Sequence, residues 1–88
     1  MLTPPDHLDD AMRAIWVELA NEMHPRIGQA GMEAYCSQVA LSRAARKRIE
    51  EEGMIVNDAR GNPVDHPAIA IARAAQNEIR QWIAKYSK

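Results

Sequence analysis

The side chains best suited to chemistry in this chain are three histidines and a single cysteine, and their spacing argues against an active site. His7, His24 and His66 lie in three separate predicted connections, and no two of them have the spacing of metal ligands on one helix. Cys36 lies among apolar positions of a predicted helix, which favours a small buried side chain over a nucleophile. No carboxylate pair and no phosphate-binding loop stands out. We therefore predict no metal site, no cofactor and no enzymatic activity.

Basic residues form one cluster, and two interpretations of it remain open. Spacings of three and four residues place Arg43, Arg46 and Lys47 on one face of a helix, where they could contact the phosphates of double-stranded DNA. Alternatively, Glu50–Glu52 follow at four-residue spacing and neutralise a solvated face. The predicted DNA-contacting set, which adds one arginine from a downstream turn, is Arg43, Arg46, Lys47, Arg48 and Arg60. Later basic residues are further candidates with no better specificity: Arg73, Arg80, Lys85 and Lys88.

The size and composition of the chain predict one small helical domain. Its 88 residues form a single domain over 1–88, in which limited burial gives a mild expectation of self-association. Apolar residues make up 47% of the chain and include no Phe, so the core must be built largely from Ala, Ile, Leu, Val and Met, which favours helices. No apolar run approaches the length of a membrane span, and the N-terminus has no signal-peptide character. We expect a protein in a reducing, cytoplasmic setting.

The charge of the chain is divided unevenly between its two halves. Residues 1–42 carry six acidic and two basic side chains, a net charge of −4, whereas residues 43–88 carry six acidic and nine basic ones, a net charge of +3. The overall charge of −1 therefore argues neither for nor against nucleic acid, although the second half could present a basic face.

Two helices are predicted before residue 53. After an extended lead-in over 1–7, Asp9 has the position of an N-cap, and apolar residues at helical spacing continue until His24, which precedes a proline. A connection over 24–31 then leads to a long helix over 32–52. Gly53 ends this helix, because a glycine tolerates the left-handed conformation beyond a helix C-terminus.

A β-hairpin and a third helix complete the chain. The segment 54–65 combines β-branched residues with the turn sequence Arg60-Gly61-Asn62-Pro63 and predicts a small hairpin. His66 and Pro67 then have the positions of an N-cap and of a first helical residue. The last helix carries a heptad seam, formed by Ala68, Ala72, Ala75, Ile79, Trp82 and Tyr86. The seam could serve as core alone or as core together with a subunit contact.

The predicted fold is therefore mainly α. It has three helices, of which the long central helix and the heptad-patterned last helix form an antiparallel pair, with a small β-hairpin between the second and third helices.

Several motifs occur together in the order found in a known family. Pro5 precedes a helix that contains Ala11 and Trp16. Further along are the segments Glu33–Cys36 and Glu51–Val56, then Gly61-Asn62, and then Pro67-Ala68 at the head of an Ala-rich helix. Over residues 5–86 the chain resembles the small subunit of phage terminase, of the P27-type family. One departure is His66, which stands where the family usually has Asn.

This resemblance implies a role in viral DNA packaging. Small subunits of this kind form homo-oligomeric rings, recognise double-stranded viral DNA in the cytoplasm of the host cell, and present it to the terminase large subunit, which carries the ATPase and nuclease. The resemblance thus implies a non-catalytic protein. The alternative is a helical protein-interaction or assembly adaptor without DNA binding, which the net charge of −1 favours.

Overall fold

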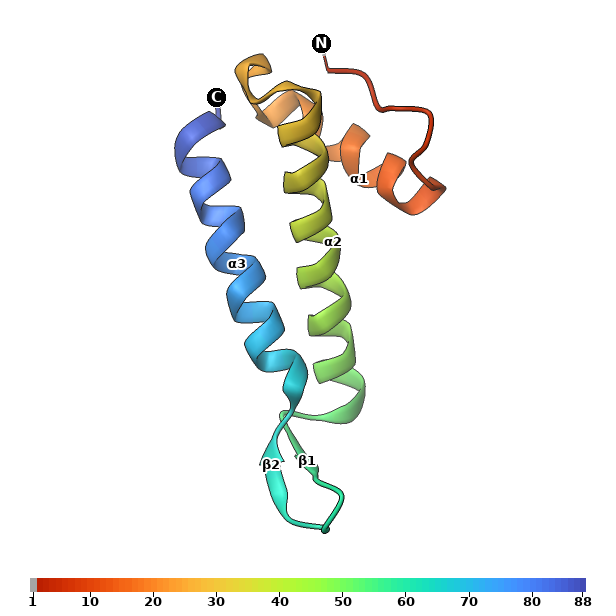
Figure 1. The fold of residues 1–88 in the computed structure, drawn as a ribbon, viewed down its shortest axis with the longest axis vertical. Coiled ribbons are helices and arrows are strands. Elements are labelled where there is room, and N and C mark those ends of the chain that lie inside the picture. Colours follow the sequence, from red (N-terminus) through yellow and green to blue (C-terminus); the bar gives the residue numbers. More distant parts are fainter. Residues whose placement is uncertain (1) are drawn as a thin grey trace.

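A computed structural model describes residues 2–88 as three α-helices and one β-hairpin (Figure 1). The helices are α1 (Asp10–Leu19), α2 (Gly28–Glu52) and α3 (Pro67–Tyr86), and the strands are β1 (Ile55–Asn57) and β2 (Pro63–Asp65). Helices α2 and α3 run antiparallel side by side, α1 packs near the start of α2, and the hairpin projects from the other end. The predicted fold class is confirmed. The molecule is elongated and flat, with principal extents of 51, 27 and 17 Å.

Helix α1 begins as predicted but ends earlier. The backbone N–H of Met12 donates to Asp9 Oδ1 at 2.8 Å, which makes Asp9 the N-cap. The predicted continuation to His24 is wrong, because α1 ends at Leu19 and a 3₁₀ turn, η1 (Ala20–Glu22), follows. Met23 is then extended and only 1% exposed. The tighter turn carries Met23 into the core, so burial of this side chain outweighs the helical pattern.

The C-terminus is tied to the residues that follow η1. Met23 and Ser87 form an isolated antiparallel bridge. The N–H of His24 donates to the Tyr86 carbonyl at 2.6 Å, and the N–H of Lys88 donates to the Glu22 carbonyl at 3.0 Å. These contacts hold the end of α3 beside the connection between α1 and α2.

Helix α2 starts at Gly28, earlier than the predicted start at residue 32. A second 3₁₀ turn, η2 (Pro25–Ile27), runs directly into α2 at Gly28, so most of the predicted connection is helical. Gly31 lies inside the helix at a close contact, where an added Cβ would meet Ile27 Cγ1 at 2.9 Å and Trp82 Cζ3 at 3.4 Å. Helix α2 ends at Gly53, whose φ of +88° with ψ of 161° is a conformation open to glycine, although it is not the left-handed helical one.

The hairpin and the start of α3 match the prediction. Strands β1 and β2 pair antiparallel in the register Ile55 with Asp65, Val56 with Val64 and Asn57 with Pro63. Pro67 is the first residue of α3, and the ring Nδ1 of His66 accepts the N–H of Ala68 at 2.9 Å. The departure from Asn at this position therefore keeps a side-chain cap.

Large buried side chains are concentrated at one end of the molecule. Trp16, Met23, Met32 and Cys36 are less than 2% exposed and lie in the core cluster at the end of the molecule where α1 packs against α2. Toward the hairpin, the buried apolar residues between α2 and α3 are small: Ala45, Ala68 and Ala75. The hairpin end thus consists of two closely packed helices without a covering third helix. Within residues 2–88, no helix is long and apolar enough to cross a membrane.

Candidate functional site

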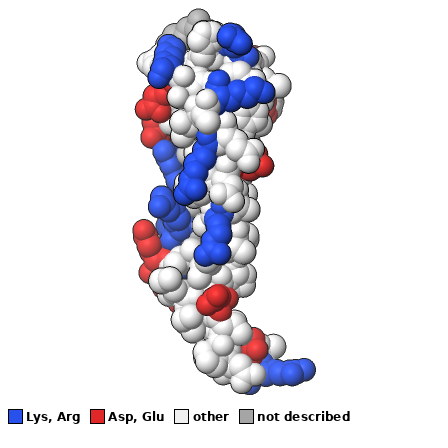
Figure 2. All heavy atoms as spheres, turned by 90° about the vertical axis from the view of Figure 1, so that its left-hand side faces the viewer, with Lys and Arg blue, Asp and Glu red and all other residues white. Residues whose placement is uncertain are grey.

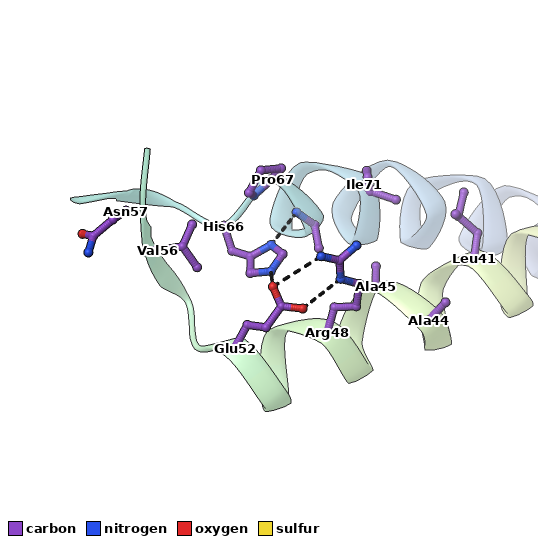
Figure 3. A pocket seen from close by; sticks show the side chains of 11 residues that line it. Leu41, Ala44, Ala45, Arg48, Glu52, Val56, Asn57, His66, Pro67 and Ile71 are labelled. Carbon is purple, nitrogen blue, oxygen red and sulfur yellow. Dashed lines mark hydrogen bonds and ion pairs between the residues drawn. The ribbon is translucent and has the colours of Figure 1, made fainter. Parts of the chain in front are cut away.

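A polar junction joins the end of α2 to the start of α3 (Figure 3). His66 is 5% exposed, and its Nε2 lies 3.1 Å from Glu52 Oε1. Because Nδ1 accepts a backbone N–H, the neutral ring carries its proton on Nε2 and donates it to Glu52. Glu52 also accepts from Arg48 Nε at 3.0 Å. The hydrogen bond from Arg48, followed by that from His66, lowers the pKa of the Glu52 carboxyl below its ordinary value.

An apolar groove lies beside this junction, and we call it the His66 groove. Its walls come from α2, from α3 and from the hairpin, and its polar members are the three residues of the junction together with Asn57. Leu41 and Ile71 are 46% and 44% exposed, so its walls are open to solvent. The residues that line it are Leu41, Ala44, Ala45, Arg48, Glu52, Val56, Asn57, His66, Pro67, Ala68 and Ile71. Since the junction pairs its charges internally, the groove offers mainly apolar contact.

A second apolar groove, which we call the Met54 groove, is formed by other residues of the same two helices and by Met54, which lies between α2 and β1. It is lined by Arg46, Ile49, Glu50, Met54, Ile69 and Ala72. Met54 is 65% exposed. Ile69 and Ile71 are two positions apart on α3, a rotation of about 200°, so they point to opposite sides of the contact between α2 and α3. The two grooves therefore lie on opposite broad faces of the molecule.

Three members of the predicted DNA-contacting set face glutamates. Arg43 donates two hydrogen bonds to Glu18 of α1, at 2.8 and 3.0 Å, a partner that sequence spacing could not indicate. Lys47 lies 3.9 Å from Glu51, and Arg48 pairs with Glu52 as expected. The hydrogen bond from Arg43 lowers the pKa of the Glu18 carboxyl. These three cations already have an acidic partner within the chain.

The other two members of the predicted DNA-contacting set are Arg46 and Arg60, and they differ in their lack of an acidic partner within residues 2–88. Within residues 2–88, neither Arg46 nor Arg60 lies in an ion pair, so the predicted pairing of Arg46 with Glu50 is absent. Arg46 borders the Met54 groove beside Ile69 of α3. Arg60 lies in the hairpin turn, where its backbone N–H donates to Asp58 Oδ1 at 2.9 Å. The predicted cluster is therefore not uniform. Arg46 differs from Arg43, Lys47 and Arg48 because it has no acidic partner within residues 2–88.

A line of basic side chains follows α3. Figure 2 views the molecule from the side of α3 and shows Lys and Arg along much of its length above the hairpin, with acidic side chains mostly at the margins. Arg73 and Arg80 are seven residues apart and so lie on one side of the helix. Among residues 2–88, neither forms an ion pair. We call Arg46, Arg73 and Arg80 the basic strip. The sequence identified these arginines only one by one. It could not predict the strip, because the strip combines residues of two helices.

The heptad seam of α3 contributes to the core. Ala68 and Ala75 are buried, and Ile79, Trp82 and Tyr86 pack half-buried against the core cluster. The rings of Trp82 and Tyr86 stack with centroids 5.8 Å apart. The intramolecular role of the seam is thus visible in the fold. Its use in a subunit contact stays a prediction.

The cysteine and the three histidines have separate surroundings in the part of the chain that the structure describes, residues 2–88. Cys36 is fully buried, and burial raises the pKa of its thiol to about 11, which opposes formation of a nucleophilic thiolate. His24 and His66 cap helical turns, and His7 bonds to Glu33 at 2.8 Å. Across residues 2–88, no three His, Cys, Asp or Glu side chains are placed to hold a metal ion.

Comparison with known proteins shows which family the chain belongs to. The family model for the phage terminase small subunit matches residues 12–87, which is most of the chain. The chain belongs to this family. The match includes α2, the hairpin and all of α3, which are the elements that form both grooves and the basic strip. A search of curated proteins found no match for this small-subunit chain. A search of solved structures also found none. Small subunits of this family are generally non-catalytic.

Proposed function

We propose that this protein is the DNA-recognising, non-catalytic small subunit of a phage terminase. In this proposal it binds double-stranded viral DNA in the cytoplasm of the host cell and presents it, as an oligomer, to the large ATPase and nuclease subunit. The family assignment supports a small-subunit role. The single observation that supports DNA contact is the basic strip, whose three arginines have no acidic partner within residues 2–88.

The basic strip is better suited to phosphate than the predicted cluster as a whole. A guanidinium that already holds a carboxylate must exchange that partner for a phosphate, and Arg43 and Arg48 would each leave a glutamate unpaired. Arg46, Arg73 and Arg80 have no such exchange to make. Their contacts would release counterions from DNA, so binding should weaken steeply with salt. Among the originally predicted residues, Arg46 and Arg60 are therefore preferred over Arg43, Lys47 and Arg48.

The test compares two sets of charge-neutral variants in a DNA-binding titration. Arg46→Gln, Arg73→Gln and Arg80→Gln should each reduce affinity for duplex DNA and lower the magnitude of the salt slope by about one per lost phosphate contact. Arg43→Gln and Arg48→Gln are the matched controls, since they remove the same charge from paired positions, and they should change affinity little. Equal losses of DNA affinity in the two sets of variants would reject the basic strip as the DNA-binding surface. Absence of duplex binding by the wild-type protein would reject DNA recognition.

A second candidate function is a helical assembly adaptor that contacts only proteins. The observation that favours it is the pair of apolar grooves at the hairpin end, where Met54, Ile55 and Ile71 are 65%, 58% and 44% exposed. The same salt titration separates the two functions. An adaptor would show no duplex affinity at low salt, although it would still associate with protein partners.

A further inference from the structure

Helix α3 turns one face away from the rest of the molecule. Ala75 is 1% exposed and Ile79 packs against the core cluster. Asn77 lies two residues from each of them, a rotation of about 200° on a helix, so its side chain points away from α2. In Figure 1, α3 forms one edge of the molecule, and Figure 2 looks onto that edge. The residues on this side are all exposed, and we call them the outward face of α3: Ala70, Arg73, Ala74, Asn77, Arg80, Gln81 and Ala84.

Two amide side chains on the outward face are of the type that reads base pairs. Each amide carries donors and an acceptor, which match N6 and N7 of adenine in the major groove. Asn77 and Gln81 are four residues apart, so they lie one above the other on the helix. Within residues 2–88, neither side-chain amide forms a hydrogen bond. The neighbouring Gln76 differs, because its amide donates to Ser42 Oγ at 2.8 Å.

The charges around these amides suit a polyanion. Arg73 lies four residues before Asn77 and Arg80 lies three residues after it, so both arginines adjoin it on the helix surface. Neither arginine has an ion-pair partner within residues 2–88. The one acidic residue of α3 is Glu78, which is turned about 100° from Asn77 and so lies outside the outward face. The amides are therefore flanked by cations and not by carboxylates.

The shape of this edge fits the major groove. The remaining positions of the outward face are Ala70, Ala74 and Ala84, so no large side chain keeps the helix backbone away from a ligand. A helix with its side chains is about 10–12 Å wide, and the major groove of B-DNA is about 12 Å wide. The molecule measures 17 Å along its shortest axis, and the edge itself is a single helix (Figure 1). The 20 residues of α3 extend over about 30 Å, close to one turn of duplex.

We infer that α3 lies in the major groove of duplex DNA and that Asn77 and Gln81 read base edges there. Base reading rests on the proposed function, because the basic strip holds the duplex, and it adds the residues that select the sequence. Arg73 and Arg80 contact phosphates at one wall of the groove, with Arg46 of α2 beside them. Phosphate contacts set affinity and register, whereas base contacts set specificity.

The placement also predicts what kind of sequence is selected. Side-chain amides pair bidentately with adenine, through its N6 and N7 atoms. Asn77 and Gln81 are separated by about 6 Å along the helix axis, which corresponds to about two base-pair steps. The preferred site should therefore contain two adenines, on either strand, within a few base pairs of each other.

The test separates specificity from overall affinity. Duplexes that the protein prefers are first selected from a pool with a randomised centre, and affinity for the selected duplex is then compared with affinity for a scrambled duplex of the same composition. Asn77→Ala and Gln81→Ala should each reduce this ratio about 5- to 150-fold, and should leave the scrambled-duplex affinity and its salt slope unchanged. Asn21→Ala, at an exposed amide on η1, is the matched control and should change neither quantity. Alanine is the better helix former, so loss of α3 would not explain a lost preference.

A modified base shows which groove is read. Replacement of the site's adenines by 7-deazaadenine removes the N7 acceptor, which faces the major groove. This replacement should weaken binding of the wild-type protein and of Asn21→Ala, and should leave the double variant Asn77→Ala with Gln81→Ala unaffected.

The outcomes distinguish base reading from DNA binding as such. A selection that yields no preferred sequence, or alanine variants that keep the wild-type ratio, would overturn base reading. The proposed function would stand in that case, provided that the scrambled duplex still binds with the salt dependence of the basic strip. If the wild-type protein binds no duplex at low salt, both are rejected, and the outward face of α3 is left for contact with a protein.

Discussion

His66 Nε2 lies 3.1 Å from Glu52 Oε1, so one contact joins the last residue of α2 to the residue that caps α3. The same ring accepts the Ala68 N–H, and the same carboxylate accepts from Arg48. The backbone N–H of His66 also donates to the Met54 carbonyl at 2.8 Å, next to the hairpin. These bonds fix where the hairpin leaves the helical pair, and therefore how the walls of both grooves are placed.

Removal of the His66 ring should destabilise the fold more than its replacement by another capping residue. His66→Ala loses the cap, the Glu52 contact and a buried ring, and should lower the free energy of unfolding by about 2 kcal/mol. His66→Asn keeps a capping side chain and should cost about half of that. Urea unfolding followed by circular dichroism measures both values. Equal losses for the two variants would show that the cap contributes nothing.

Acid should weaken the fold through two carboxylates. The pKa values of Glu18 and Glu52 are lowered below the ordinary 4.5, chiefly by their hydrogen bonds from Arg43 and Arg48. A lowered native pKa means that the stabilisation is complete above about pH 4.5 and is lost as the pH falls through the native values. Unfolding measured from pH 7 to pH 3 should show this decline. The free energy of unfolding of the double variant Glu18→Gln with Glu52→Gln should decline less over this pH range. A decline identical to that of the wild-type protein would contradict the assignment of the acid sensitivity to these two carboxylates.

The parts of the fold that were predictable from sequence depend on local chemistry. Asp9 caps α1, Pro67 opens α3, and Gly53 ends α2, because each acts within a few residues of its own position. The hairpin follows from β-branched residues around a turn. The early end of α1 was not predictable, since Met23 leaves the helix to enter a core completed by the C-terminus.

The candidate surfaces could be predicted from the sequence less well than the fold. Spacing within α2 indicated the pairing of Arg48 with Glu52, but Glu18 holds Arg43 from 25 residues away, across two helices. The basic strip likewise combines Arg46 of α2 with arginines of α3. Two seam positions, Ala68 and Ala75, are buried, whereas the grooves beside the seam depend on how closely Ala45 and Ala68 let the helices approach.

Cys36 should be protected from thiol reagents in the folded protein. The thiol is fully buried, and burial raises its pKa to about 11, so the thiolate is scarce at neutral pH and the reagent has no access. Ellman's reagent at pH 8 should label the native protein far more slowly than the urea-unfolded protein, and a rate close to that of the unfolded chain would contradict this burial. The Val17→Cys variant supplies an exposed thiol as control, since residue 17 is 63% exposed.

Gly31→Ala should destabilise the protein even though alanine is the better helix former. A Cβ at this position would lie 2.9 Å from Ile27 Cγ1, so the Ile27 side chain would have to shift, and it would contact Trp82 Cζ3 at 3.4 Å. Overpacking of this kind costs about 1–3 kcal/mol, against a gain of about 1 kcal/mol in helix propensity. Thermal unfolding should therefore show a lower Tm for Gly31→Ala. In an Ile27→Ala background the nearest clash is absent, and the same substitution should become neutral or stabilising. A stabilising effect in the wild-type background would mean that the Ile27 side chain moves aside at little cost, and it would remove the reason for a glycine at this point of the helix.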